Sequence, residues 1–315
     1  MTYSAVTRAA VRRAVLVVNP QATATTPAGR DILAYALSSE LKLEVVETDY
    51  RGHAMDAAAR AALENVDLVV AHGGDGTVNE VVNGLRSAPH GARAPMLGVV
   101  PGGSANVFAR AIGIPRDPVE ATHQLLGALA EGRARDVALG RAADRWFTFN
   151  AGLGWDADVV AGVERKRSKQ ASPGLYARKA VAAYLRPPHG RAELTLTMPG
   201  QEPIDGIRTV FLSNTDPWSY LGSRPLHLNP GCSLNGGLGV FALRSLSLPT
   251  VVKHLVQALR KNGKQRGRRL IREDNLEKLS ITATQPVNLQ VDGDLLGQRT
   301  AVEFSCTPRA LRVVA

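Results

Sequence analysis

Cysteine is scarce in this chain of 315 residues, with Cys232 and Cys306 its only two. Two cysteines cannot build a disulfide framework, so we expect free core thiols in a protein of the reducing cytoplasm. Histidine and cysteine also lack the spacing of zinc ligands. No apolar stretch approaches the length that spans a bilayer. The five apolar residues 14–18 after Arg12-Arg13 are too few for the core of a signal peptide and predict a strand instead.

The bulk composition is that of a folded globular protein, with 44% hydrophobic and 21% charged residues. At this length one or two domains are expected. The net charge of +10 suits an anionic partner, which could be a nucleotide, a nucleic acid or an acidic membrane. The charge alone does not choose among these partners.

The chain changes character near residue 132. Before it, buried-type strands alternate with helices, two of which have N-caps at Thr26-Pro27 and Asp117-Pro118. This alternation predicts an α/β domain over residues 1–131, with a parallel sheet covered on both faces. From 132 to 307 short strands separated by turns predict a mostly antiparallel, sandwich-like β domain. The strands expected there are 137–139, 146–149, 193–198, 209–212, 239–243, 279–283 and 287–291, with helical passages at 175–185 and 250–259.

A glycine-rich turn follows the apolar run 68–71. Gly73-Gly74-Asp75-Gly76-Thr77 leads into apolar residues at helical spacing, so a helix begins near Thr77. A strand, a glycine turn and a helix N-terminus together form an anion site, because N–H groups and the helix dipole favour negative charge. Asn79 stands where the dinucleotide-binding fingerprint needs a third glycine, and the lysine of a P-loop is absent. The alternative is a turn that merely closes a strand–helix corner.

A second glycine loop runs from Pro101 to Arg110, again between an apolar strand and a helix. Ser104 is a poor candidate nucleophile, because Asn106 replaces the last glycine of the G-x-S-x-G elbow. Two such loops on neighbouring strand ends would form one phosphate cradle. Read alone, the segment could also be a tight turn beside a core Phe108.

Residues 73–85 fit the signature GGDGT-x-x-E-V-x-N-G-L at every position, and so resemble the diacylglycerol kinase catalytic-domain family of lipid kinases, which is related to sphingosine kinases and NAD kinases. Residues 101–110 resemble that family's P-x-G-T-x-N-D-F-A-R. Ser104 replaces the threonine, and Val107 replaces an aspartate that is linked to the metal through water. The resemblance implies a nucleotide site in the interdomain cleft, with ATP and Mg²⁺ as cofactors. It also implies that residues from about 308 to 315 return to the first domain.

The resemblance assigns nucleotide contacts to three loops and a strand end. Asn19-Pro20 matches the family's N-P-x-S-G loop, from which residues 21–23 depart, and Thr48 matches a nucleotide-contacting threonine. Asn19 and Thr48 could equally be turn-forming residues. Asp75 would hold the catalytic magnesium, directly or through water. The full set of expected contacts is Asn19, Thr23, Thr48, Gly73, Gly74, Asp75, Gly76, Thr77, Asn79, Glu80, Gly102, Gly103, Ser104 and Asn106.

The expected catalytic base lies far along the chain, in Asp292-Gly293-Asp294. The family has Asp-Gly-Glu here, and its glutamate takes the proton from the lipid hydroxyl, a role that falls to Asp294. Asp75 and Arg110 complete the catalytic set, with Arg110 offsetting the developing negative charge. Read alone, Asp-Gly between two strands is the favoured hairpin turn.

A second, structural magnesium loop of the family matches residues 233–238. Gly236 stands where the aspartate ligand belongs, which leaves the carbonyls of Ser233 and Leu238. Because the hard anionic ligand is missing, we expect this site to be weak or empty.

Together these features predict an ATP-dependent lipid kinase of phospholipid biosynthesis that phosphorylates diacylglycerol or a related lipid. The alternatives are an NAD kinase-like enzyme and a nucleotide-binding regulatory protein impaired in catalysis, to which Val107, Gly236 and Asp294 point. Basic runs at 164–169 and 260–269 suit an anionic membrane surface, so we expect a cytoplasmic, reversibly membrane-associated protein. No aromatic residues interleave them, which argues against nucleic acid, and a solvated loop is the plainer interpretation. The sequence does not decide the oligomeric state, a dimer included.

Overall fold

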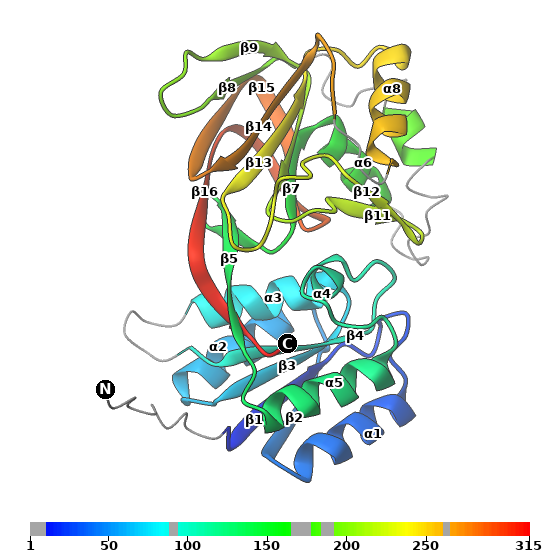
Figure 1. The fold of residues 1–315 in the computed structure, drawn as a ribbon, viewed down its shortest axis with the longest axis vertical. Coiled ribbons are helices and arrows are strands. Elements are labelled where there is room, and N and C mark those ends of the chain that lie inside the picture. The colour runs from blue at the N-terminus through cyan, green and yellow to red at the C-terminus, as the bar shows by residue number, and fades with distance from the viewer. Residues whose placement is uncertain (1–10, 88–93, 165–177, 184–191, 261–264) are drawn as a thin grey trace, which may run out of the picture. The chain divides into compact units, whose positions relative to one another are not determined.

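The computed structural model describes residues 11–87, 94–164, 178–183, 192–260 and 265–315. The chain forms two compact units, one of Met1–Asp136 with Leu311–Ala315 and the other of Val137–Ala310 (Figure 1). The chain passes between them within two strands, β5 (Arg135–Ala142) and β16 (Asp294–Val313). The sequence placed these passages at residues 131/132 and about 308.

Unit 1 is built on a parallel sheet. Its strands are β1 (Arg13–Val18), β2 (Lys42–Glu47), β3 (Leu68–Gly73) and β4 (Met96–Pro101), in the order β2-β1-β3-β4. All neighbours in this order are parallel, and the end of β16 adds Val313 beside Leu97. Every residue of β3 is buried, as its uninterrupted apolar run predicts for a strand covered on both faces.

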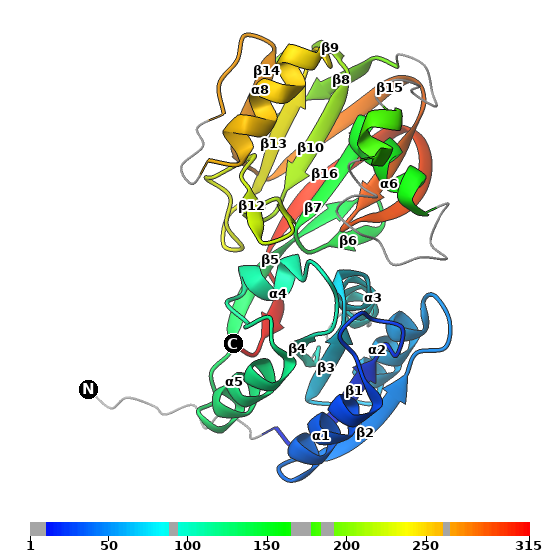
Figure 2. The same cartoon turned by 90° about the vertical axis from the view of Figure 1, so that its right-hand side faces the viewer.

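Helices cover both faces of this sheet. Helices α1 (Pro27–Ser38) and α5 (Pro118–Ala130) lie on one face, and α2 (His53–Leu63) and α3 (Asp75–Arg86) on the other (Figures 1 and 2). The expected N-caps are present. Thr26 Oγ1 accepts a hydrogen bond from the Gly29 N–H, and Asp117 accepts from Val119 and Glu120. A short helix, α4 (Val107–Ala111), follows β4.

Unit 2 is built on antiparallel strands in the order β14-β13-β10-β7-β15-β16. Strand β8 adds to β15, β9 to β8, β5 to β16 and β6 to β5, while β11 and β12 form a separate ribbon. The predicted fold class, an α/β domain followed by a mostly antiparallel β domain, is confirmed. The strands not yet bounded are β6 (Arg145–Phe147), β7 (Asn150–Gly154), β8 (Leu194–Thr197), β9 (Ile204–Ile207), β10 (Thr209–Ser213), β11 (Ser219–Leu221), β12 (Arg224–Leu226), β13 (Leu238–Leu243), β14 (Leu270–Leu276) and β15 (Lys278–Val291).

Two helices, α6 (Trp155–Glu164) and α8 (Leu248–Ala258), lie over the same face of the sheet of unit 2 (Figure 2). Of the helical passage expected at 175–185, the described part 178–183 is helical. Among the described residues, no helix has both the length and the apolar character needed to cross a membrane. Both cysteines are free, as expected.

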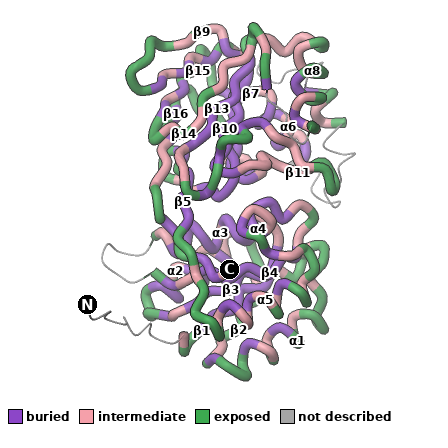
Figure 3. The backbone as a smooth tube through the Cα atoms, viewed as in Figure 1, coloured by how far each residue is buried: buried purple, intermediate pink, exposed green. Residues whose placement is uncertain are grey.

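Buried residues concentrate in the strands of each unit (Figure 3). Strands β3 and β4 form the centre of unit 1, where Leu68, Val70 and Leu97 have no exposed surface. In unit 2 the largest cluster of buried side chains gathers around β7, β10, β13, β15 and β8. The close-packed strands of unit 1 hold the loops that follow β1, β3 and β4.

Candidate functional site

Three loops of unit 1 meet at the carboxyl ends of neighbouring strands. Residues 19–25 follow β1, residues 73–77 follow β3, and residues 101–106 end β4. The Gly102 N–H donates to the Gly73 carbonyl at 2.7 Å, and the Ala24 N–H donates to the Gly102 carbonyl at 2.7 Å. The structure therefore brings together all three of the loops to which the sequence assigned a nucleotide.

The two glycine loops touch each other through backbone. A Cβ atom on Gly103 would lie 2.6 Å from the Cα of Gly74, and one on Gly102 would lie 3.0 Å from the Cα of Gly73. On Gly73 a Cβ would lie 2.5 Å from Thr77 Oγ1. The loops pack this closely only because they lack side chains, and the Gly102 N–H is used in holding them together. A bulky anion such as a phosphate would therefore meet chiefly the N–H groups at the start of the helix that follows Gly74.

Helix α3 begins at this point. Gly74 is its N-cap residue and offers no side chain to bond the first N–H groups. The half-buried carboxylate of Asp75, the first residue of α3, accepts a hydrogen bond from the Phe108 N–H at 3.3 Å. Asp75 thus ties the first glycine loop to α4. Val107, where the resemblance calls for an aspartate, is 2% exposed and packs into the core.

The second loop is closed by Asn106, whose backbone is left-handed with φ 49°. Its Oδ1 accepts from the Gly103 N–H at 3.0 Å, and its Nδ2 donates to the Gly103 carbonyl at 2.6 Å. The exposed Ser104 hydroxyl lies 3.3 Å from the hydroxyl of Thr23. Thr23 and Ser104 therefore present two adjacent hydroxyl groups, both able to donate to an oxyanion.

Asn19 holds the first loop against α3. Its N–H donates to the His72 carbonyl at 2.9 Å, its side-chain amide donates to Thr77 Oγ1 at 3.1 Å, and its Oδ1 accepts from Gln21. Thr25, which the sequence analysis did not single out, has a buried Oγ1 without a hydrogen-bond partner in the part of the chain that the structure describes. A Cβ on Gly102 would lie 2.6 Å from this atom. An unsatisfied hydroxyl beside a glycine cradle fits an anionic ligand.

Other expected contact residues form hydrogen bonds outside the glycine loops or are half-buried near them in the sequence. Asn79 is fully buried within α3 and bonded to the Asn83 side chain, while Glu80 accepts a hydrogen bond from the Gly52 N–H at 2.9 Å. Thr48 is half-buried at the end of β2, and its N–H donates to Val18. Arg110 is half-buried on α4. That these residues contact a nucleotide stays a prediction.

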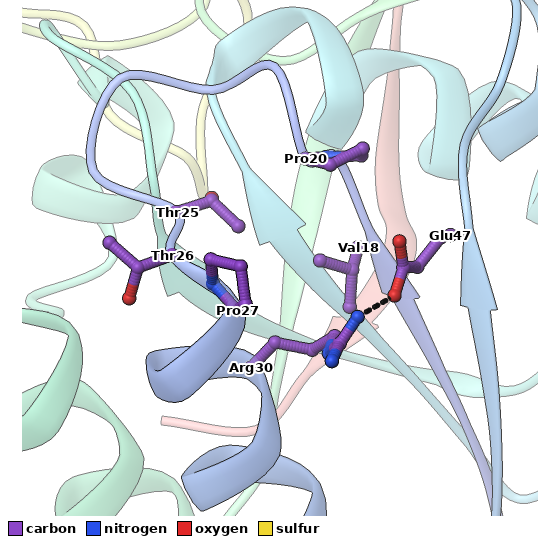
Figure 4. Close-up of a pocket in the computed structure, with 7 residues that line it drawn as sticks. All are labelled: Val18, Pro20, Thr25, Thr26, Pro27, Arg30 and Glu47. Carbon is purple, nitrogen blue, oxygen red and sulfur yellow. Dashed lines mark hydrogen bonds and ion pairs between the residues drawn. The ribbon is translucent and has the colours of Figure 1, made fainter.

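A cavity of about 80 Å³ borders the first loop (Figure 4). The ion pair between Arg30 and Glu47 lies at one side of it. Sequence reasoning missed this cavity, because its walls come from β1, β2 and the start of α1. The residues that line it are Val18, Pro20, Thr25, Thr26, Pro27, Arg30 and Glu47.

In unit 2, Asp294 follows the tight turn between β15 and β16. Asp292 and Gly293 have φ values of 48° and 82°, as a type I′ hairpin requires, and Val291 pairs with Asp294. Asp292 accepts four hydrogen bonds of 2.7–3.1 Å, from the N–H and hydroxyl of Thr148 and the N–H groups of Phe149 and Asn150. The hairpin reading and a functional role for Asp294, which is 8% exposed, are thus compatible.

A buried polar network holds this hairpin. Gln290 Oε1 accepts from the Gly293 N–H at 3.0 Å, and Gln290 Nε2 donates to Asp156 at 2.7 Å and to Asn150 at 3.2 Å. Burial raises the pKa of Asp156 to about 7, with the nearby Asp158 adding to the rise and the Gln290 hydrogen bond opposing it. The sequence analysis missed Asp156 as a support of the hairpin, because its partner lies 134 residues away.

The expected second metal loop offers little to a hard cation. The Ser233 carbonyl accepts a hydrogen bond from the Gly236 N–H at 3.0 Å, and Leu238 is buried as the first residue of β13. Gly236 supplies no carboxylate. That this site is weak or empty stays a prediction, which rests on the missing carboxylate.

The basic runs are described in part. Residues 165–169 and 261–264 lie outside the described residues.

Sequence comparisons connect the chain to proteins of one kind. Residues 13–142 match the family model described as the diacylglycerol kinase catalytic domain. The chain is 30% identical to a diacylglycerol kinase of Bacillus subtilis (strain 168), over 96% of each chain. It is also 37% identical to a diacylglycerol kinase of Staphylococcus aureus (strain NCTC 8325 / PS 47), over 43% of this chain and 42% of that protein.

Solved structures show the same fold. A crystal structure of a diacylglycerol kinase from Bacillus anthracis str. Sterne matches with a TM-score of 0.71 at 20% identity, over 96% of each chain. An NAD kinase from Archaeoglobus fulgidus in complex with ATP matches with a TM-score of 0.53 at 13% identity, over 96% of this chain and 93% of that one.

Proposed function

The chain belongs to the diacylglycerol kinase family, and we propose that it transfers the γ-phosphate of ATP to the hydroxyl of diacylglycerol or a closely related lipid. It is a phosphotransferase that acts on an alcohol group. The observation that carries the proposal is the backbone contact between Gly73-Gly74 and Gly102-Gly103 at adjacent strand ends. Glycine loops that meet at adjacent strand ends beside a helix N-terminus are suited to binding phosphates.

The loops of unit 1 bind and orient the phosphates in this proposal. Backbone N–H groups at the start of α3 face the negative charge, and the helix dipole favours it. The hydroxyls of Thr23 and Ser104 lie side by side at the same loops, and Thr25 adds a buried hydroxyl. Phosphoryl transfer depends mostly on positioning and on charge neutralisation, which is what such a cradle supplies.

Asp75 is the residue that would hold a magnesium ion, directly or through water. Its carboxylate is half-buried at the first glycine loop, where it accepts a hydrogen bond from the Phe108 N–H. When bound, Mg²⁺ neutralises phosphate charge. Since Val107 cannot contribute a carboxylate, Asp75 carries this function with the phosphates themselves, and Arg110 adds positive charge for the transition state.

Asp294 is the proposed general base that accepts the proton of the lipid hydroxyl. The support for this role is the rigid hairpin that carries it, anchored by the four hydrogen bonds to Asp292 and by Gln290. A base fixed in this way needs no reorganisation when the hydroxyl arrives. The same proposal places the enzyme in phospholipid biosynthesis, at an anionic membrane surface reached from the cytoplasm.

The proposal is tested by offering purified protein labelled [γ-³²P]ATP and Mg²⁺ with a panel of acceptors. The panel contains dispersed diacylglycerol, monoacylglycerol, a sphingoid base and NAD. We expect label in phosphatidic acid, with transfer to diacylglycerol at least tenfold faster than to NAD. Label in NAD alone would favour the NAD kinase reaction, for which the fold similarity to the Archaeoglobus fulgidus enzyme speaks. ATP binding without transfer to any acceptor would favour a regulatory protein impaired by Val107, Gly236 and Asp294.

A further inference from the structure

Helix α8 exposes a continuous apolar stripe. Leu248, Val252, Leu255 and Val256 are 61%, 48%, 47% and 46% exposed. The spacings of four, seven and eight residues place them on one face of the helix. Single exposed apolar residues are ordinary on protein surfaces, but four on one helical face form a patch that calls for a partner.

The opposite face of α8 is already used. His254 and Ala258 are 4% and 2% exposed, and the His254 ring packs edge-on against Phe241 of β13, with ring centroids 5.4 Å apart. Helix α8 lies over the strands of unit 2, and no labelled element covers its outward face (Figure 2). The apolar stripe is therefore additional to the contacts that hold the helix in place.

Basic side chains occur on α8 and just after it. Lys253 is exposed on α8 next to Val252 in the sequence, and Arg260 is exposed two residues after the helix ends. The chain then returns along the helix, where Gln257 exchanges two hydrogen bonds with the backbone of Arg266, at 3.1 and 3.3 Å. This pairing holds the following segment, with exposed Arg268 and Arg269, beside α8 on the side of Gln257, which lies two and a half helical turns from Leu248 and so faces away from the stripe. From Arg244 to Arg272 the sequence has nine Lys and Arg and no Asp or Glu.

A helix with an exposed apolar face, an exposed lysine and no acidic residue, next to a segment with exposed arginines, matches the interface of an anionic bilayer. There apolar side chains enter the acyl boundary and basic ones meet the headgroups. We propose that α8 is a membrane-docking helix that lies in the plane of an anionic lipid surface, with Val252 and Leu255 inserted. This proposal rests on the proposed function, because docking would bring the enzyme to its lipid substrate. A second protein copy is the less fitting occupant, because two such basic surfaces would repel each other.

The test is co-sedimentation with vesicles of phosphatidylcholine alone or with 30% phosphatidylglycerol, in the absence of nucleotide. We expect binding to the mixed vesicles only, weakened by 0.5 M NaCl. The double variant Val252→Asp/Leu255→Asp should lower the bound fraction at least tenfold. Val119→Asp, which changes a valine 70% exposed on α5 of unit 1, is the matched control and should bind as wild type does.

A variant with fewer basic side chains separates the contribution of electrostatic attraction to the headgroups from that of apolar insertion. Lys253→Ala/Arg268→Ala should weaken binding to the mixed vesicles by about fivefold for each basic side chain. Equal sedimentation of wild type and the Val252→Asp/Leu255→Asp variant would overturn the proposal, as would a wild type that ignores phosphatidylglycerol. A dimer in light scattering that the same variant dissociates would overturn it too, in favour of a second copy.

Failure of docking and failure of the kinase reaction are distinguishable. Vesicle binding is measured without turnover, whereas the kinase reaction is measured on a short-chain diacylglycerol that dissolves in water. Transfer to the soluble lipid without vesicle binding would contradict the docking proposal and support the kinase proposal. Vesicle binding without transfer would contradict the kinase proposal and support the docking proposal.

Discussion

Asp292 and Asp294 stand on either side of one glycine, yet the hairpin uses them differently. Asp292 is the structural carboxylate, because it takes four hydrogen bonds from residues 148–150. Asp294 begins β16 and is the carboxylate that we assign to chemistry. The sequence indicates the Asp-Gly turn from local preference alone. It could not indicate the anchoring of Asp292, because that depends on partners more than 140 residues away.

Asp156 gives this network a pH dependence. Its pKa is about 7 in the folded protein against 3.8 for an ordinary aspartate, chiefly through burial. Between these pH values the folded state keeps a proton that the unfolded state has released, so the free energy of unfolding falls as pH rises from about 4 to about 7. The contribution of the Asp156 proton to the free energy of unfolding is fully present below pH 4 and absent above pH 7. Its size is at most about 4 kcal/mol.

Asp156→Asn should therefore flatten the pH profile of stability. Urea unfolding between pH 4.5 and 8, followed by tryptophan fluorescence, measures this in unit 2, which contains Trp146, Trp155 and Trp218. We expect the stability of wild type relative to the variant to fall as pH rises through this range. Asp205→Asn, at an exposed carboxylate of β9, is the control and should keep the wild-type slope. Parallel profiles for wild type and Asp156→Asn would contradict the assignment.

At the scale of elements, the two glycine loops were predictable and their support was not. The strand–turn–helix pattern around Gly73 and Gly102 follows from apolar runs, glycines and helical spacing. The docking of residues 19–25 onto Gly102 does not, because residues 21–23 depart from the family pattern and the contact is tertiary. The sequence analysis also missed strands, which are β7, β9, β11, β12, β14 and β16. Much of β14 is only partly buried, and β16 has a continuous exposed stretch at residues 298–301, so neither has the buried-strand pattern.

Gly103→Ala tests whether the loops must touch. A Cβ atom there would lie 2.6 Å from the Cα of Gly74, so the loops have to separate. We expect ATP affinity, measured by isothermal titration calorimetry, to fall at least tenfold. Gly127→Ala is the matched control, because its Cβ would meet nothing within 4 Å inside α5. That control should bind ATP normally and gain up to about 1 kcal/mol of stability. Equal affinities of the two variants would show that the contact is not needed.

At the scale of the molecule, the order of the elements made the fold class predictable. Strands that alternate with helices favour a parallel sheet, and successive strands without helices between them favour an antiparallel one. The chain passes from one unit to the other inside β5 and back inside β16. No change in composition occurs at these exact residues, so the sequence could place the boundaries only approximately. The net charge of +10 gains a place in the fold only with the structure, which carries exposed Lys253 on α8 and exposed Arg268 and Arg269 on the segment paired with this helix. Sequence reasoning found the basic run at 260–269 but could not give the apolar face beside it.

The central claim of the proposed function is that Asp294, in the β-rich unit, is the general base of the lipid kinase reaction. Asp294→Asn keeps the shape of the side chain and removes the base, so transfer of label from [γ-³²P]ATP to diacylglycerol should fall at least about 100-fold, with unchanged ATP affinity. Asp144→Asn, at an exposed carboxylate of unit 2, should keep full turnover. Wild-type turnover in a folded Asp294→Asn variant would contradict the account.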